Sequence, residues 1–344
     1  MKTYSDITLT AAPFVYTRLP ASKINICILS LLGIQILILA LSADLYALLN
    51  IIFSVLGVIF IENLIRYLNG SKLSLSLETI ISGVLIGFFM PTEIGFIFVF
   101  ALSAFSLFIT KTVFGGIGKN WINPTAFAVC IAYISHPEAF PPVLANFSLL
   151  RENGSFFAVM EANGLIRLKA DFTITSFFNS LILHSVGVTL PEGYISLFLN
   201  STSVIPAFRY NIITLLSSIV LFSVKAVDFI LPAAFIAVYS LLVWVFGMVP
   251  VSHTYFTGDI LSALLTGGVL FSAFFVMTEP SSSPKTKYGK LMVGTLMGLF
   301  GFFICVQGAS PAGIFFTIIL TNIISPLIER LEIKIQAKKR SRYE

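Results

Sequence analysis

The chain has 344 residues, of which 57% are hydrophobic and 11% are charged, and its formal net charge is +5. Its mean hydropathy is +0.95. Soluble domains carry about 25% charged residues, so this composition excludes an ordinary soluble protein. The basic residues lie in short gaps between apolar runs and in the tail "KIQAKKRSRYE". They form no basic face of the kind that binds nucleic acid, and the sequence predicts a membrane protein.

A helix that crosses a membrane needs about 20 mostly apolar residues. Reading along the chain gives about ten candidate spans. The predicted spans are 25–42, 44–67, 79–90, 94–111, 122–135, 210–225, 227–246, 259–277, 289–307 and 311–329. The runs 79–90 and 122–135 are too short to cross alone. Short or interrupted segments are typical of transporters that build a site near the middle of the membrane.

The short loops that carry Lys or Arg alternate along the chain with loops that carry neither, such as "MPTEIG", "GMVPVSH" and "VQGASPAG". Because basic loops stay inside, both termini are predicted to be cytoplasmic, in a bacterial inner membrane. The predicted domains are a first five-helix repeat (1–135), a small extracytoplasmic domain (136–208), a second five-helix repeat (209–330) and a basic cytoplasmic tail (331–344).

Two segments of the chain are similar to each other. "TIISGVLIGFFMPTEIG" (79–95) and "LLTGGVLFSAFFVMTEPSS" (264–282) share Gly-Val-Leu in step, a Phe-rich stretch and a Thr-Glu pair beside a proline. Five predicted helices precede the extracytoplasmic region and five follow it, so two copies of one unit would insert with opposite orientation. The predicted fold is an all-α polytopic membrane protein with about ten transmembrane helices in two inverted five-helix repeats.

Two polar turns interrupt the apolar sequence, "FGGIGKNWINPTAFAV" (114–129) and "MTEPSSSPKTKYGKLMVGTLMGL" (277–299). Together they resemble the RnfD/NqrB family, which comprises membrane proteins of the Rnf electron-transport complex and of the sodium-translocating NADH:quinone reductase. The residues that fit the first family motif are Gly115, Gly116, Gly118, Asn120, Asn123 and Pro124. Those that fit the second are Thr278, Pro280, Ser283, Pro284, Thr286 and Gly289, with Glu279 in place of Asp.

The resemblance covers nearly the whole chain and implies a component of an ion-translocating oxidoreductase. Such a complex couples electron transfer on the ferredoxin/NAD side to Na+ or H+ transport, and its other components include iron–sulfur and small membrane proteins. The resemblance also implies a flavin, FMN or riboflavin. The residues expected at a cofactor are Asn120, Asn123, Thr278, Glu279 and Thr286. For Asn120 and Asn123, support of the helix start and contact with a cofactor both remain open.

One family feature is missing from this sequence. Relatives attach FMN to a Thr of an S-G-A-T motif, and this chain has no S-G-A-T. At the corresponding place, Asp171 precedes Thr173-Ile174-Thr175-Ser176, and Ser176 is the equivalent of the attachment residue. Both small residues of the motif are absent, and Ile174 obstructs the approach of a flavin phosphate. An ordinary hydroxyl-rich strand or turn is the favoured interpretation, and the chain is expected to carry no covalent flavin or to attach it differently.

Other polar residues have structural and functional interpretations. Glu62, four residues before Arg66, favours an i, i+4 ion pair, with a proton or Na+ relay as the alternative. Asp228 and Asp259 begin spans and are expected to be N-terminal anions. Glu279 is a plausible anion for the helix that follows it. The three histidines lack the spacing of a metal site, and the three cysteines lie in separate apolar runs, which favours buried thiols.

Two other function classes remain open from the sequence. One is a solute or ion channel that shares the inverted-repeat fold. The other is a flavin-free scaffold that holds partner subunits and part of an ion path. The polar turn "TEPSSSPKT" (278–286) argues against a free-standing channel, because it has the character of a docking surface for soluble redox partners.

Overall fold

The computed structural model describes residues 20–70, 72, 75–114, 122–141, 168–169, 171–183, 192–199, 203–247, 258–307 and 310–340. In these ranges every regular element is a helix. Before residue 136 they are α1 (Ala21–Leu41), α2 (Leu45–Leu68), α3 (Leu77–Phe89), α4 (Phe96–Leu107), the π-helical turn η1 (Phe108–Thr112) and α5 (Pro124–Ser135).

The middle of the chain contributes short elements. They are η2 (Pro137–Ala139), α8 (Asp171–Phe178), η3 (Asn179–Leu183), α9 (Tyr194–Leu199) and η5 (Pro206–Phe208). The remaining helices are α10 (Asn211–Ser223), α11 (Ile230–Phe246), α13 (Ile260–Leu265), α14 (Val269–Phe271), η6 (Ser272–Val276), α15 (Lys287–Gly301), η7 (Phe302–Gln307) and α16 (Gly313–Arg340).

Several helices have the length and composition of membrane spans. Four are long and apolar enough to cross a bilayer, namely Ala21–Leu41, Leu45–Leu68, Lys287–Val306 and Gly313–Glu332. Shorter apolar helices of 10–17 residues pack among them. Since apolar side chains also cover much of the outer surface of these helices, the protein is an all-α membrane protein. The predicted tail from residue 331 begins inside α16, which continues to Arg340.

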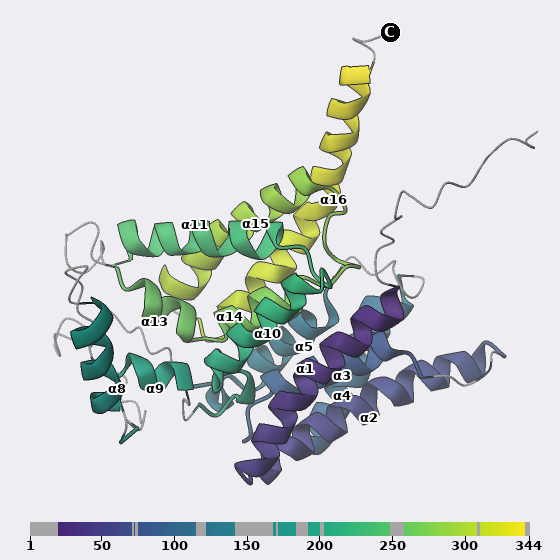
Figure 1. Ribbon diagram of the computed structural model, residues 1–344. Helices are drawn as coiled ribbons and strands as arrows, with labels where there is room; N and C mark the ends of the chain where they lie inside the picture. The colour runs from purple at the N-terminus through teal and green to yellow at the C-terminus, as the bar shows by residue number, and fades with distance from the viewer. Residues whose placement is uncertain are drawn as a thin grey trace, which may run out of the picture.

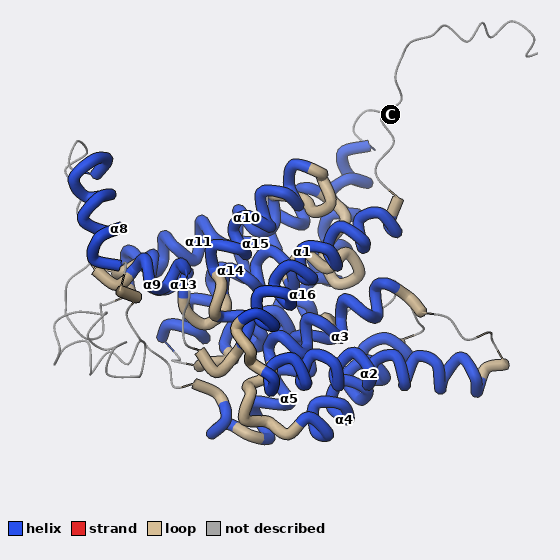
Figure 2. Tube along the Cα trace, turned by 60° about the horizontal axis from the view of Figure 1, so that its bottom comes forward, coloured by secondary structure: helices blue, strands red, loops and turns tan. Residues whose placement is uncertain are grey.

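The two parts of the chain form neighbouring groups of helices. Figure 1 shows α1 to α4 on one side of the molecule and α11, α15 and α16 on the other, with α8 and α9 at the far edge. The view in Figure 2 agrees, since α8 again stands apart from the helix bundle. The C-terminal end of α16 projects from the bundle.

Small residues let the main helix pairs approach closely. Gly57 of α2 faces the backbone of Phe100 in α4, and a Cβ at this position would overlap the Phe100 carbonyl oxygen. In the second group, Gly294 and Gly298 of α15 face the backbone of α11 in the same way. Close packing at small residues is a common basis of helix association in membranes, so α2–α4 and α11–α15 are the central pairs of the two groups.

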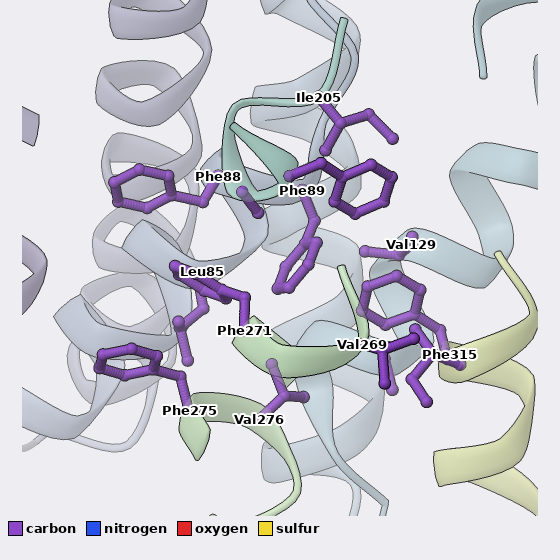
Figure 3. Close-up of a cluster of buried hydrophobic side chains, with 14 of the residues drawn as sticks. Leu85, Phe88, Phe89, Val129, Ile205, Val269, Phe271, Phe275, Val276 and Phe315 are labelled. Carbon is purple, nitrogen blue, oxygen red and sulfur yellow. The ribbon is translucent and has the colours of Figure 1, made fainter. Parts of the chain in front are cut away.

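An aromatic core joins the two groups of helices (Figure 3). The Phe89 ring of α3 lies edge-on to Phe271 of α14 and to Phe315 of α16, with ring centroids 5.2 and 4.6 Å apart. Phe88 also contacts Phe271, at 5.6 Å. Such pairs contribute about 0.5–1.5 kcal/mol each beyond the burial of their surface. The interface between the groups is therefore apolar and tightly packed.

The predicted span 259–277 is not one helix. α13 ends at Leu265, and the chain then turns through Gly267 and Gly268, which both have left-handed backbones with φ of +63° and +66°. Glycine adopts this conformation without the steric penalty of a Cβ, so two adjacent glycines end the helix where hydropathy alone predicts a continuous span. The similar segment before residue 136 forms the unbroken helix α3.

Candidate functional site

The two polar turns meet in the folded chain through Asn123. This residue is the N-cap of α5, and its Oδ1 accepts a hydrogen bond from the Ala126 amide at 3.0 Å. Its Nδ2 donates to the Val276 carbonyl at 3.0 Å and to Glu279 Oε2 at 2.6 Å. Asn123 and Glu279 are 156 residues apart in sequence, so one buried amide joins the two turns that resemble the family motifs.

These contacts occupy almost all of the hydrogen-bonding capacity of the Asn123 side chain. An asparagine amide has two hydrogens to donate, and both are donated within the protein. The residue is 1% exposed. Its contacts therefore give Asn123 a structural role, while a cofactor contact stays a prediction. Asn120 and the glycines of the first turn, residues 115–118, lie outside the described residues.

Glu279 has a different role from the one predicted for it. It is not the N-terminal anion of the next helix, because α15 begins eight residues later at Lys287 and is capped by Thr286. Its second carboxylate oxygen, Oε1, accepts a hydrogen bond from Ser281 at 2.9 Å. The Thr278 hydroxyl bonds back to the Phe274 carbonyl at 2.7 Å. Glu279 therefore ties its own turn to α5.

Thr286 connects the second turn to the last helix. Its hydroxyl accepts from the Gly289 amide at 2.9 Å and donates to the two carboxylate oxygens of Glu332 at 2.6 and 2.5 Å. Glu332 is 8% exposed. A Cβ at Gly289 would come within 3.0 Å of Glu332 Oε2, so glycine at this position leaves room for the carboxylate.

Sequence reasoning did not identify Glu332. A helical signal for it exists, because Thr321, Ser325, Ile328 and Glu332 follow one another at spacings of four, three and four and are all buried. This period places the carboxylate on the core side of α16. The helical period does not identify the partner of Glu332, because Thr286 is 46 residues away in sequence.

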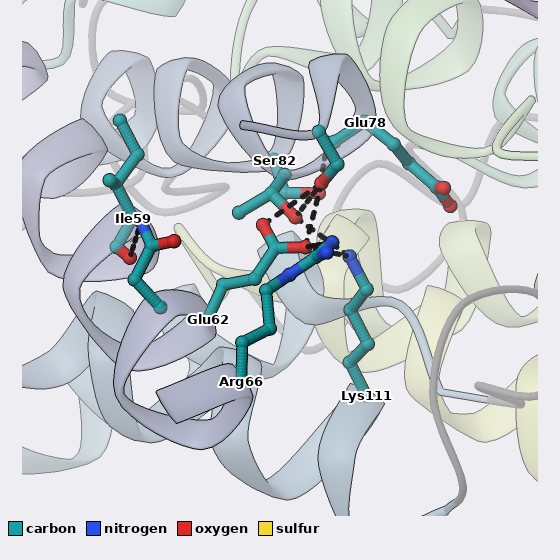
Figure 4. Close-up of polar contacts among 9 residues, drawn as sticks. Ile59, Glu62, Arg66, Glu78, Ser82 and Lys111 are labelled. Atoms are coloured by element: carbon teal, nitrogen blue, oxygen red, sulfur yellow. Dashed lines mark hydrogen bonds and ion pairs between the residues drawn. The ribbon is translucent and has the colours of Figure 1, made fainter. Parts of the chain in front are cut away.

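A charged cluster lies at the same end of α2, α3 and α4 (Figure 4). The predicted ion pair is confirmed, with Arg66 Nη2 2.8 Å from Glu62 Oε1. The Ser76 hydroxyl lies 3.0 and 2.9 Å from the two carboxylate oxygens of Glu62. Lys111 Nζ donates to Thr79 Oγ1 at 2.7 Å and lies 3.9 Å from Glu62 Oε1. The contacts join three helices, and the relay interpretation of Glu62 stays a prediction.

A second set of contacts joins the two groups of helices at the opposite end. Arg209, just before α10, pairs with Asp44 at the start of α2, with Nη1 and Oδ2 2.6 Å apart. The hydroxyls of Ser42 and Tyr210 lie 2.8 Å apart. Asp44 also caps α2 by accepting from the Ala47 amide at 3.2 Å. Both ends of the interface between the groups are thus held by polar contacts.

Comparison with known families assigns the chain to one of them. The model of the NQR2, RnfD, RnfE family matches residues 8–338. The chain belongs to this family. Among its relatives is a protein of Haemophilus ducreyi that is named as the D subunit of an ion-translocating oxidoreductase complex. It is 28% identical over 236 residues, which cover 65% of this chain and 67% of the relative.

Two further relatives in the NQR2, RnfD, RnfE family carry the same name. The protein of Actinobacillus pleuropneumoniae serotype 5b is 28% identical over 241 residues, and that of Haemophilus influenzae strain PittEE is 26% identical over 252 residues. In both cases the match covers 65% of this chain and 67% of the relative. The family assignment and the resemblance inferred from the two turns therefore coincide.

The segment where this family member lacks the S-G-A-T motif is helical. Ser176 lies in α8 and is exposed, and its hydroxyl donates to the Thr173 carbonyl at 2.9 Å. The strand or turn favoured from the sequence is therefore wrong. Asp171, the first residue of α8, accepts hydrogen bonds from the amides of Gly193 and Ser196 at 2.8 and 2.7 Å. These bonds hold α8 against the start of α9.

The electrostatics of Asp171 follow from these contacts. Burial by itself would raise the pKa of the Asp171 carboxyl, but hydrogen bonds from Ser196, the Gly193 amide and Thr175 favour the charged form and lower its pKa below the usual value. Asp171 is 0% exposed. The acid that stands at the start of the missing motif is thus an internal cap rather than a group open to a ligand.

His, Cys, Asp and Glu side chains do not gather into a metal site in the described part of this family member. No group of three or more His, Cys, Asp or Glu side chains comes together within it. His184 and His253 lie outside the described residues. The three cysteines are free thiols. Asp259 caps α13 by accepting from the Ser262 amide at 3.0 Å, as predicted, whereas Asp228 pairs with Lys290 of α15.

Proposed function

We propose that this chain is the RnfD-type membrane component of an ion-translocating oxidoreductase complex, which couples electron transfer on the ferredoxin/NAD side to Na+ or H+ transport. The observation that carries the proposal is the contact between Asn123 and Glu279. It joins two turns that are far apart in sequence and that both resemble motifs of this family. The relatives from Haemophilus ducreyi and Actinobacillus pleuropneumoniae are named as the D subunit of an ion-translocating oxidoreductase complex.

The proposal includes two inverted five-helix halves, 1–135 and 209–330. Backbone conformation supports this layout. Ala43 and Lys225 are the two non-glycine residues with positive φ in the described residues, at 56° and 55°. Each lies two residues after the end of the first helix of its half, α1 or α10. A left-handed non-glycine residue is uncommon, so its recurrence at matching places favours a common ancestral unit.

Helix form and packing support the same layout. The fourth helix of each half changes to a π-helix in its last turn, at η1 after α4 and at η7 after α15. Insertions of this kind are rare in helices. The second and fourth helices of each half, α2 with α4 and α11 with α15, also form the glycine-mediated pairs. Transporters built from inverted repeats place their sites where the halves meet.

The described residues do not form a good binding site for the flavin that the family resemblance implies. Both amide hydrogens of Asn123, both carboxylate oxygens of Glu279 and the Thr286 hydroxyl are engaged inside the protein. Ser176 lies in a helix without the small residues that a flavin phosphate needs beside it. We therefore derive no electron-transfer step through a flavin, and these contacts favour a flavin-free scaffold and ion-path protein as the second candidate.

In either case the chain's own residues hold the membrane part together. The Asn123 and Thr286 contacts fix the polar turns at one end, and the Asp44–Arg209 pair fixes the other. Between them the Phe89, Phe271 and Phe315 rings exclude water from the interface of the halves. A packed apolar layer between polar ends is a barrier to ion leakage, which a coupled transporter needs.

Purification from the native membrane tests the proposed function. We expect the tagged chain, extracted in a mild detergent, to bring with it iron–sulfur subunits and small multi-pass membrane subunits. Membrane vesicles that contain the complex should build an ion gradient during oxidation of reduced ferredoxin by NAD+. If the chain purifies alone, and by itself conducts solutes in liposomes, it is a channel of the same fold and the proposal is wrong.

A further inference from the structure

The broken third helix of the second half differs from its counterpart in the first half. Both segments contain Gly-Val-Leu in step, yet α3 runs unbroken through Gly83 whereas the chain between α13 and α14 turns through Gly267 and Gly268. The hydropathy of residues 259–277 gives no reason for a break in the helix at these glycines. Interrupted helices in transporters expose main-chain oxygens inside the membrane, and these oxygens coordinate ions. The break is thus a place to search for a ligand.

A second observation at the break points to a ligand. Ser272 begins η6, and its side chain is 0% exposed. Its hydroxyl has no hydrogen-bond partner among the residues that the structure describes. A buried hydroxyl without a partner is destabilising, so a group other than these side chains is needed to satisfy it.

Ser272 lies directly after the break in the helix. Its amide bonds to the Gly268 carbonyl at 2.9 Å, which places Ser272 one turn beyond the left-handed glycines. Side chains on a helix lean back toward its N-terminus, here toward Gly268. From the other side, the carbonyls in the last turn of α13 point along the helix axis toward the break. The carbonyls of Thr266 and Gly268 each accept one hydrogen bond, from the amides of Val269 and Ser272, and each keeps a second lone pair. The hydroxyl and these main-chain oxygens thus flank the same break in the helix.

The position of α13 is fixed by a buried amide. Asn211 donates from Nδ2 to the Leu265 carbonyl at 2.8 Å and to the Leu197 carbonyl of α9 at 3.0 Å. It is 1% exposed. The end of α13 is therefore held at a defined place relative to α9 and α10, which is what a preformed set of oxygen ligands requires.

The break is covered by an aromatic ring. The Phe208 ring packs directly on Gly268, where a Cβ would overlap its edge. Phe208 in turn contacts Phe89 with ring centroids 6.3 Å apart. The cover on this side of the break is therefore apolar and supplies no polar group of its own.

The uncharged sequence of the segment that forms the break limits the class of ligand. Residues 260–278 contain no Asp, Glu, Lys, Arg or His. Neutral oxygens alone do not compensate a divalent ion, which takes carboxylate ligands, and they do not carry a proton, which needs a titratable group. The geometry points to a site for a small monovalent cation, Na+ or Li+, bound by the Ser272 hydroxyl and the main-chain carbonyls at the Thr266–Gly268 break.

This site extends the proposed function, because it names the place where the transported ion binds. Only the role given to the bound ion rests on the proposed function, and the test measures ion binding by the chain alone. The full-length chain in detergent is unfolded by heat in NaCl or in choline chloride at constant ionic strength. We expect its midpoint temperature to rise with NaCl, since a ligand that binds only the folded state stabilises it.

Three variants make the test specific. Ser272→Ala should raise the half-saturating Na+ concentration about tenfold, a loss equivalent to about 1.4 kcal/mol, and Ser272→Thr should restore it. Ser240→Ala is the matched control, because Ser240 in α11 is another hydroxyl without a partner in the described residues but lies in an unbroken helix. It should keep the Na+ dependence of the parent chain.

Two results would overturn the site. One is an unchanged Na+ dependence in Ser272→Ala, and the other is a parent chain that responds equally to Na+ and choline, which would leave a bound water as the partner of Ser272. If Ser272→Ala does not fold, Ser272→Cys replaces it, since a thiol has similar volume and is a weak acceptor. A complex that pumps ions without this Na+ response would refute the site and leave the proposed function standing.

Discussion

Asn123 uses its whole donor capacity on neighbours in the folded chain, and only an amide of this length satisfies all of its contacts. Its Oδ1 caps α5, while Nδ2 reaches one main-chain carbonyl and one carboxylate. A leucine or alanine here leaves the Glu279 carboxylate and the Val276 carbonyl without this donor. Because buried acceptors without partners are costly, the residue matters for stability before any ligand is considered.

The coupling between Asn123 and Glu279 is measurable. We expect Asn123→Ala and Glu279→Ala each to lower the free energy of unfolding, and the double variant to lose less than the sum, with a coupling energy of about 1 kcal/mol or more. Thermal unfolding of the four proteins in detergent measures the cycle. Glu93→Ala is the control, because Glu93 is the exposed carboxylate of the similar turn after α3. Strict additivity of the two single changes would contradict the contact.

Ser176 gives a second prediction at the level of single residues. Its place in α8, with Ile174 and Thr175 in the positions of the small motif residues, gives a flavin phosphate no access to the backbone. We expect the chain, purified with its partners and run on a denaturing gel, to show no flavin fluorescence under ultraviolet light. A fluorescent band that disappears in Ser176→Ala would show that the attachment exists despite the missing motif.

Part of the site could be predicted from sequence, and part could not. Asn123, Glu279 and Thr286 are identifiable because each belongs to a polar turn with unusual Gly, Pro and Ser spacing. The bond between Asn123 and Glu279 is not predictable from either turn alone, since it depends on how α5 and η6 pack. Glu332 carries only a helical period, and nothing in that period indicates that a threonine 46 residues away is its partner.

At the level of elements, α8 and α9 depend on one carboxylate. Asp171 has a folded-state pKa below its ordinary value of 3.8, so it binds protons less readily in the folded than in the unfolded chain. Its contribution to stability is therefore present above the unfolded pKa and is lost as the pH falls below about 3.8 toward the lower folded pKa. This segment should loosen in acid.

The Asp171 prediction is tested by comparing two proteins. We expect Asp171→Asn to have a lower midpoint temperature than the parent chain at pH 7, because its amide hydrogens oppose the amides of Gly193 and Ser196. The difference between the two should shrink as the pH falls through the window below 3.8. Glu93→Gln, a change at an exposed carboxylate, controls for general acid effects. A difference that stays constant with pH would refute the role of the charge.

Helix positions were more predictable than helix continuity. The first span was predicted at 25–42 and the second at 44–67, and the structure places α1 at Ala21–Leu41 and α2 at Leu45–Leu68. Hydropathy follows the bilayer and so locates apolar runs well. It is insensitive to two adjacent glycines inside a run, which is why 259–277 was predicted as one helix and is interrupted at Gly267–Gly268.

At the level of the whole molecule, polar contacts at both ends and aromatic rings between them define one interface. The Asn123–Glu279 bond lies at the end that carries the polar turns, and the Asp44–Arg209 pair lies at the other. The broken helix of the second half lies between these ends, beside the aromatic core.

Site-specific labelling directly tests whether the two halves lie in the membrane with opposite orientation. In a chain with Cys27, Cys130 and Cys305 replaced by alanine, a single cysteine is introduced at Glu93 or at Lys285, exposed positions of the two similar turns. A membrane-impermeant maleimide should label Glu93→Cys on intact cells and Lys285→Cys only after the cells are opened. Labelling of both positions from the same side would contradict the inverted arrangement.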